Sequence, residues 1–212
     1  MRLSEPPAGK SLKDLAAITD SHHRVAGVDE AGRGPLAGPV VVAAVMLPDK
    51  YTLQGMDDSK RLSPETRESL FPQIQSEALS WAIEIVDVEE IDRINILRAT
   101  FKGMQRAVST LQPQPTLTLV DGNRAPELSC EVHTIIEGDH WVPAISAASI
   151  LAKVTRDRMM QDWHREFPDY GFDRNKGYPT PEHLRLLKEH GPCPIHRRTF
   201  APVRELLEPS LF

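Results

Sequence analysis

Cysteine is scarce in this sequence: only Cys130 and Cys193 occur in 212 residues. Two cysteines cannot build a disulfide framework or a four-cysteine zinc site, and they suit a reducing compartment. No apolar run approaches the roughly 18 residues that a membrane span needs. The first residues also lack the apolar core of a secretory signal. These absences argue against secreted and membrane proteins, and we expect a cytoplasmic location.

An excess of positive charge is also missing, because the net charge is −5. Proteins whose only function is to bind nucleic acid usually carry a net positive charge. The charge is uneven, however. Residues 1–152 carry 14 Lys and Arg against 21 Asp and Glu, whereas residues 153–198 carry 10 against 7. An acidic body with a basic C-terminal third is compatible with a metal-centred enzyme that acts on a polyanion.

The composition, with 40% hydrophobic and 26% charged residues, is that of one globular domain. Short apolar, β-branched runs predict strands at 25–29, 39–47, 81–88, 117–121 and 132–136. Capping signals and apolar residues at helical spacing predict helices at 64–79, 94–111, 143–165 and 181–190. Strands followed by long helices indicate an α/β fold with a mixed sheet. Residues 1–23 are predicted to be an N-terminal appendage.

Acidic residues follow three of the predicted strands. Asp29, Asp121 and Asp139 stand at or just past strand ends, and Glu30 adds a fourth carboxylate beside Asp29. Sites in open α/β sheets gather where strands end. Converging carboxylates need a cation, and all-oxygen ligand sets select Mg²⁺ or Mn²⁺ over zinc. The alternative for any one of these aspartates is a turn or a helix cap.

A glycine-rich turn joins the first two predicted strands. Gly32 and Gly34 allow the backbone to approach a ligand closely, and Arg33 between them supplies a cationic fork. The turn is neither a P-loop nor a dinucleotide fingerprint, because a strand rather than a helix follows it.

Seven sequence blocks, in order, resemble the bacterial ribonuclease HII family of type 2 ribonucleases H. The blocks are 27–39, 58–62, 120–123, 138–154, 170–172, 175–180 and 196–200. The resemblance covers about residues 24–203 and implies an RNase H-like fold. That fold is a mixed five-stranded sheet flanked by helices, with a short C-terminal helical extension that helps to hold substrate. Residues 204–212 would then form a C-terminal tail.

The resemblance also implies the site. Four acids would ligate two Mn²⁺ or Mg²⁺ ions during catalysis: Asp29, Glu30, Asp121 and Asp139. The Gly32-Arg33-Gly34 turn would contact the ribose 2′-hydroxyl, and Tyr178 would stack on the sugar of the next nucleotide. The implied activity is endonucleolytic cleavage of RNA in RNA–DNA hybrids and 5′ to single ribonucleotides in duplex DNA, leaving 3′-hydroxyl and 5′-phosphate ends.

Further substrate contacts are predicted from the same blocks and from helical spacing. The candidates are Lys60, Ser146, Ser149, Lys153 and Arg197. The serines lie on one helix face with Lys153, where small side chains could equally serve close packing against the sheet. His196, beside two arginines, is a candidate nucleic-acid contact. Arg156 and Arg158 are predicted to lie on an exposed helix face.

Three alternatives remain at this point. Ribonuclease HIII carries a large extra N-terminal domain, which 23 residues cannot supply, and it lacks the Gly-Arg-Gly turn. A non-catalytic hybrid-binding module would be favoured if one of the four acids were missing. A DNA-only nuclease of the same fold is disfavoured by the turn and by Tyr178. We further expect a monomer, and a possible replication-clamp contact through the apolar Leu211-Phe212 end.

Overall fold

The computed structural model describes residues 19, 22, 24–53, 55–56 and 61–208. The predicted appendage therefore falls almost entirely outside the description, as does Lys60. Five strands form one mixed sheet in the order β3-β2-β1-β4-β5. They are β1 (Val25–Ala31), β2 (Val40–Met46), β3 (Ser80–Val86), β4 (Leu117–Asp121) and β5 (Glu131–Ile135). β1 pairs antiparallel with β2 and parallel with β4, which confirms the predicted mixed sheet.

The interior strand β2, between β3 and β1, explains how the sheet separates two apolar layers. All seven of its residues are buried. Alternate side chains of a strand point to opposite faces of the sheet. Accordingly Val41, Ala43 and Val45 pack in one cluster with α2 (Pro64–Glu77) and α6 (Pro143–Glu166). Val42 and Ala44 pack in another with α4 (Ile96–Thr110).

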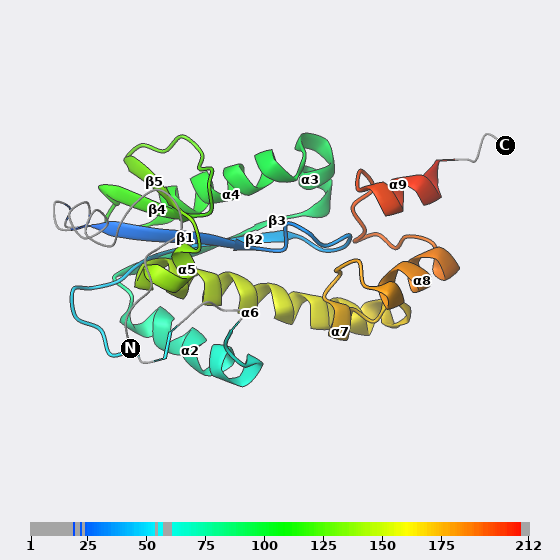
Figure 1. The fold of residues 1–212 in the computed structure, drawn as a ribbon, viewed down its shortest axis with the longest axis horizontal. Coiled ribbons are helices and arrows are strands. Elements are labelled where there is room, and N and C mark those ends of the chain that lie inside the picture. Colours follow the sequence, from blue (N-terminus) through cyan, green and yellow to red (C-terminus); the bar gives the residue numbers. More distant parts are fainter. Residues whose placement is uncertain (1–18, 20–21, 23, 54, 57–60, 209–212) are drawn as a thin grey trace.

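Figure 1 shows the resulting three layers, with α6 running along one face of the sheet and α4 covering the other. α2 lies outside α6, and α3 (Val88–Ile94) precedes α4. The predicted stripe of apolar residues in α4 is confirmed, because Met104 and Val108 are buried against the sheet. Among the described helices, none combines the length and apolarity that crossing a bilayer requires.

A group of short helices extends beyond the sheet at the far end of α6 (Figure 1). It comprises η1 (Pro168–Tyr170), α7 (Phe172–Asn175), α8 (Pro181–His190) and α9 (Ala201–Leu207). The predicted helix at 181–190 is confirmed. α9 extends across residues 204–207 of the predicted C-terminal tail. Its Val203 is fully buried with Leu36 and Leu187, and this contact anchors the helix.

Candidate active site

Two of the four predicted acids lie side by side on neighbouring strands, Asp121 at the end of β4 and Asp29 two residues before the end of β1. β1 and β4 run parallel, with Val28 opposite Val120, so Asp29 and Asp121 follow as adjacent residues at the same edge. Asp29 is buried, and Ser149 of α6 forms a side-chain hydrogen bond with it. The backbone N–H of Glu30 also donates to Asp29 Oδ1 at 2.7 Å. The predicted convergence of strand-end acids therefore holds for this pair.

Asp139 reaches the same place through a short helix. α5 (Gly138–Trp141) begins after Glu137, whose φ of 55° turns the chain sharply. The N–H of Gly138 donates to Asp121 Oδ1 at 2.7 Å, which fixes the start of α5 against the end of β4. Asp139, the next residue, is buried at this junction. All four acids thus lie on three adjoining segments, β1, β4 and α5.

The electrostatics of Asp29 indicate how closely the acids approach. Burial raises the pKa of Asp29 well above its ordinary value, and the neighbouring charges of Glu30 and Asp121 raise it further. Carboxylates crowded in this way favour a bound cation, and their oxygens are the ligands that Mg²⁺ and Mn²⁺ prefer. The donor chemistry therefore fits a hard divalent ion. Within the described residues, however, no group of three or more acidic, His or Cys side chains stands arranged to hold an ion.

The Gly32-Arg33-Gly34 turn leaves β1 beside these acids. Arg33 Nη1 donates to Glu30 Oε1 at 3.2 Å, so the turn and the acidic edge are in direct contact. Gly32 has a φ of +98°, and a Cβ there would lie 2.1 Å from Nε of Arg156. Glycine is therefore required at position 32 both by conformation and by space. A Cβ at Gly34, in contrast, would meet only Tyr178, at 3.6 Å.

Arg197 supports this turn through hydrogen bonds from its buried side chain. Its side chain is 0% exposed, and its guanidinium donates to the carbonyls of Arg33 and Gly38, each at 2.9 Å, and to those of Gly32 and Pro39. Four of the five N–H donors of this guanidinium thus go to main-chain carbonyls, and its burial keeps the fifth away from a phosphate in solution. The prediction that Arg197 contacts substrate is therefore wrong, because the residue supports the turn instead.

Arg156 makes a similar set of bonds from α6. It is 1% exposed and donates to the carbonyls of Pro39, Ala37 and Lys176, each at 3.0 Å. The prediction of an exposed position for Arg156 is wrong. The signal that could have found it is its spacing, since Arg156 follows Ser149 by seven residues, on the helix face that begins with the buried Ser146.

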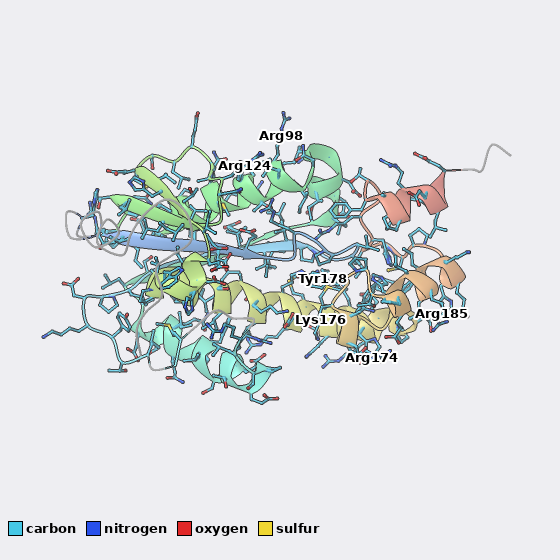
Figure 2. All side chains as sticks on the ribbon, viewed as in Figure 1. Arg98, Arg124, Arg174, Lys176, Tyr178 and Arg185 are labelled. Atoms are coloured by element: carbon cyan, nitrogen blue, oxygen red, sulfur yellow. The ribbon has the colours of Figure 1, made fainter. Side chains whose placement is uncertain are left out.

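Tyr178 lies between α7 and α8, above the middle of α6 (Figure 2). Its ring is 42% exposed and lies beside Gly34. The guanidinium of Arg156 sits 5.8 Å from the ring centroid. Figure 2 also shows Lys176, Arg174 and Arg185 on the same helical extension. Tyr178 thus stands at the surface, next to the glycine turn, in the most basic part of the chain.

The remaining predicted contacts divide by burial. Ser146 and Ser149 of α6 are both buried. Ser146 also lines a pocket of about 160 Å³ together with Asp139 and Trp141. Lys153 is partly exposed and pairs with Asp157 at 2.7 Å. His196 is buried, so it cannot contact a duplex, and that prediction is also wrong.

The comparison with known sequences is decisive. The sequence model of the ribonuclease HII family matches residues 26–203. The chain belongs to the ribonuclease HII family. It is 54% identical to ribonuclease HII of Bordetella pertussis over 202 residues, which cover 95% of this chain and 98% of that protein. It is 58% identical to ribonuclease HII of Burkholderia thailandensis over 184 residues, 87% and 86% of the two chains.

Solved structures agree with this assignment. Ribonuclease H2 of Pyrococcus horikoshii superposes with a TM-score of 0.72 at 31% identity, over 86% of this chain and 96% of that one. A ribonuclease HIII bound to Mn²⁺ has the same fold at 19% identity, with a TM-score of 0.66 over 96% and 75%. The RNase H-like fold is therefore confirmed. As a member of this family, the chain is a divalent-metal-dependent endonuclease with ribonuclease H activity on RNA–DNA hybrids.

Proposed function

We propose that this enzyme, besides cutting RNA in hybrids, nicks duplex DNA 5′ to a single embedded ribonucleotide and leaves 3′-hydroxyl and 5′-phosphate ends. The recognition element is the Gly32-Arg33-Gly34 turn together with Tyr178. A 2′-hydroxyl is the one group that separates ribonucleotide from deoxyribonucleotide at a given position. Backbone groups of a rigid turn can donate to it and accept from it without any base contact.

The observation that carries this proposal is the placement of the turn. It contacts the acidic edge through Arg33 and Glu30, and Tyr178 faces it at Gly34. Arg197 draws the turn's carbonyl oxygens inward and fixes its shape before any ligand arrives. The turn that would recognise the sugar thereby lies within a few residues of the proposed metal ligands Asp29 and Glu30.

The chemistry at the acidic edge uses Asp29, Glu30, Asp121 and Asp139 as the ligands of two Mg²⁺ or Mn²⁺ ions. When bound by these four acids, such ions would supply activation of a water molecule and stabilisation of charge on the leaving oxygen. The protein's own residues orient this site. Ser149 hydrogen-bonds Asp29, and the Gly138 N–H fixes Asp121. Lys153 and the basic residues near α7 and α8 supply contacts to the phosphate backbone, and such contacts make binding salt-sensitive.

The test uses a labelled DNA duplex that contains one ribonucleotide, with an all-DNA duplex as control, in Mg²⁺, Mn²⁺ or a chelator. We expect metal-dependent nicking 5′ to the ribonucleotide by the wild type. Asp29→Asn should lower the rate at least ~100-fold, because a ligand carboxylate contributes several kcal/mol. Asp162→Asn, a change at an exposed acid on α6, is the matched control and should leave the rate unchanged.

Gly34→Ala tests the turn separately from the metal ligands. The added methyl meets no atom of the fold closer than 3.6 Å but projects toward Tyr178, into the proposed sugar site. We expect a folded enzyme that has lost most of its nicking at the single ribonucleotide. Wild-type activity in Gly34→Ala, or equal cleavage of the all-DNA duplex, would show that the turn does not read the 2′-hydroxyl.

We also propose a sliding replication clamp as a partner. The support is the apolar Leu211-Phe212 end, together with a relative from Archaeoglobus fulgidus whose solved structure is a complex of ribonuclease HII with PCNA. That relative matches with a TM-score of 0.71 at 29% identity, over 84% of this chain and 95% of that one. Binding of the purified bacterial clamp should disappear on deletion of residues 209–212. Unchanged binding by the truncated chain would contradict this contact.

A further inference from the structure

Two buried histidines meet through their ring nitrogens in the helical extension, with the ring planes tilted by 37°. His183 of α8 is 0% exposed, and His196, in the loop before α9, is 1% exposed. Their Nε2 atoms are 3.1 Å apart. At this distance one nitrogen must carry the hydrogen and the other must present its lone pair. The two rings therefore cannot hold the same tautomer at this contact.

The neighbouring hydrogen bonds decide which ring donates. The backbone N–H of Cys193 donates to His196 Nδ1 at 3.0 Å, so Nδ1 is an acceptor and the proton of His196 lies on Nε2. His196 Nε2 then donates to His183 Nε2. The proton of His183 must lie on Nδ1, which donates to the carbonyl of Tyr178 at 2.9 Å. All four ring nitrogens are used, and both rings are neutral.

The surroundings favour this neutral, one-directional chain. The rings of Tyr170 and Phe172 pack against the two histidines, with centroids 5.0 Å from His196 and 5.5 Å from His183, respectively. The Tyr170 hydroxyl is engaged elsewhere, since it donates to Gly191 O at 2.8 Å. Burial lowers the pKa of both histidines.

The chain of bonds ends at a segment whose backbone is otherwise unfavourable. Lys176 has a φ of 50° and Gly177 a φ of 81°, immediately before Tyr178. Non-glycine residues rarely adopt such a φ unless their surroundings hold it. The Tyr178 carbonyl accepts from Thr180 N–H at 2.7 Å as well as from His183. The histidine bond is thus one of two at the Tyr178 carbonyl, and the Tyr178 N–H donates to the carbonyl of Asn175 at 2.9 Å.

We propose that His196 and His183 are positioning residues for Tyr178: the bond chain from Cys193 through both rings to the Tyr178 carbonyl sets the ring of Tyr178 against the glycine turn. This inference rests on the proposed function, in which Tyr178 contacts the sugar next to the cleaved ribonucleotide. Neither histidine touches substrate. Their effect is transmitted through the backbone of residue 178, over a path that crosses from the loop at 193–196 to α8.

The first test reads the tautomers directly and needs no substrate. Long-range ¹H–¹⁵N correlation spectra of the ¹⁵N-labelled full chain distinguish Nδ1–H from Nε2–H histidines, and His183→Asn and His196→Gln assign the two signals. We expect His183 protonated only at Nδ1 and His196 only at Nε2 from pH 8 to pH 6. Identical tautomers, or a doubly protonated ring at pH 6, would overturn the proposal even if nicking is confirmed.

The second test follows the effect through Tyr178. His183→Leu removes the bond to the Tyr178 carbonyl, whereas His183→Asn places an amide N–H near the position of Nδ1. We expect His183→Leu to raise KM on the single-ribonucleotide duplex about 5- to 10-fold, the effect of one lost hydrogen bond, with His183→Asn restoring most of it. His190→Asn, an exposed change on the same helix, should have no effect.

The double variant separates positioning from a general loss of structure. In a Tyr178→Ala background, His183→Leu should raise KM no further, because its only route to substrate has been removed. A full additional 5- to 10-fold loss in that background would mean that His183 acts by another route. If the wild type fails to nick at a single ribonucleotide, the proposed function fails, and the tautomer measurement still reports on the bond chain.

Discussion

At the scale of single residues, two arginines show how a basic side chain can serve a nucleic-acid enzyme without touching nucleic acid. Burial lowers the pKa of Arg197 to about 9 and that of Arg156 to about 10, so both remain charged at neutral pH. Among the described residues, neither guanidinium pairs with a carboxylate. Their donors go to carbonyl oxygens of the 32–39 turn and of Lys176. The planar fork of arginine suits such divergent acceptors, and the compact ammonium of lysine does not.

Arg197→Lys should therefore destabilise the fold although it keeps the charge. Lysine has three N–H donors on a single nitrogen and cannot reach all the carbonyls that the arginine fork bonds. Buried carbonyls of the turn are then left unpaired, and each unpaired group costs about 1–3 kcal/mol. We expect the free energy of unfolding in urea to fall by about 2–4 kcal/mol. Arg198→Lys, at the exposed neighbouring residue, should change it by less than about 0.5 kcal/mol. Equal values for the two variants would mean that the carbonyl contacts contribute nothing to stability.

At the scale of elements, the packing of α6 on β1 positions the catalytic edge. A Cβ at Gly27 would lie 2.2 Å from backbone atoms of Ala144 and Ile145. The missing side chain lets the start of α6 approach the strand directly. One helical turn later, Ser149 reaches Asp29, the residue two positions beyond Gly27 on the same face of β1. The close approach of α6 to β1 thus allows the hydrogen bond between Ser149 and Asp29.

Gly27→Ala should displace α6 from β1. Overpacking against backbone atoms costs at least about 1–3 kcal/mol, since no flexible side chain can move aside. We expect this loss in urea unfolding, together with lower nicking activity because Ser149 moves away from Asp29. Gly34→Ala adds the same methyl where the fold has space and should leave stability unchanged. A stable, fully active Gly27→Ala enzyme would contradict the close-approach argument.

At the scale of the whole molecule, the buried histidines make stability depend on pH. Burial and the neighbouring His183 lower the pKa of His196 to about 4, against an ordinary 6.5. Between these two values the unfolded chain binds a proton that the folded chain does not. Stability is therefore complete above pH 6.5 and falls as the pH decreases toward 4. Tyr170 and Phe172 of the helical extension pack against these rings.

We expect the free energy of unfolding to fall between pH 7 and pH 4.5, with a contribution from His196 on the order of 3 kcal/mol. Urea unfolding at four pH values in this range measures it. His196→Gln removes the titrating group, so the difference between wild type and variant isolates the histidine from the carboxylates. Parallel stability curves for the two proteins would show that His196 does not titrate with folding.

Much of the fold follows from local patterns. The strand at 117–121 and the helix at 181–190 have the bounds that their residues predict, because alternation, caps and prolines act over a few positions. The acids at strand ends were also visible in the sequence, since parallel neighbouring strands bring their carboxyl ends to one edge. The seven family-like blocks identified the ribonuclease HII family before any contact was known, and the family match over residues 26–203 confirms it.

Only the tertiary structure decided which polar residues face inward. A basic C-terminal third suggests a solvated or substrate-binding surface, yet Arg156, Arg197, His183 and His196 are buried there. Their partners lie in distant segments: Arg197 bonds the turn at 32–39, more than 150 residues earlier in the chain. Periodicity encodes which face of an element is apolar, but the acceptors that allow a charge to be buried come from elsewhere in the fold. The sequence by itself therefore determined the family, the sheet and the acids, whereas long-range hydrogen bonding determined how the site is held.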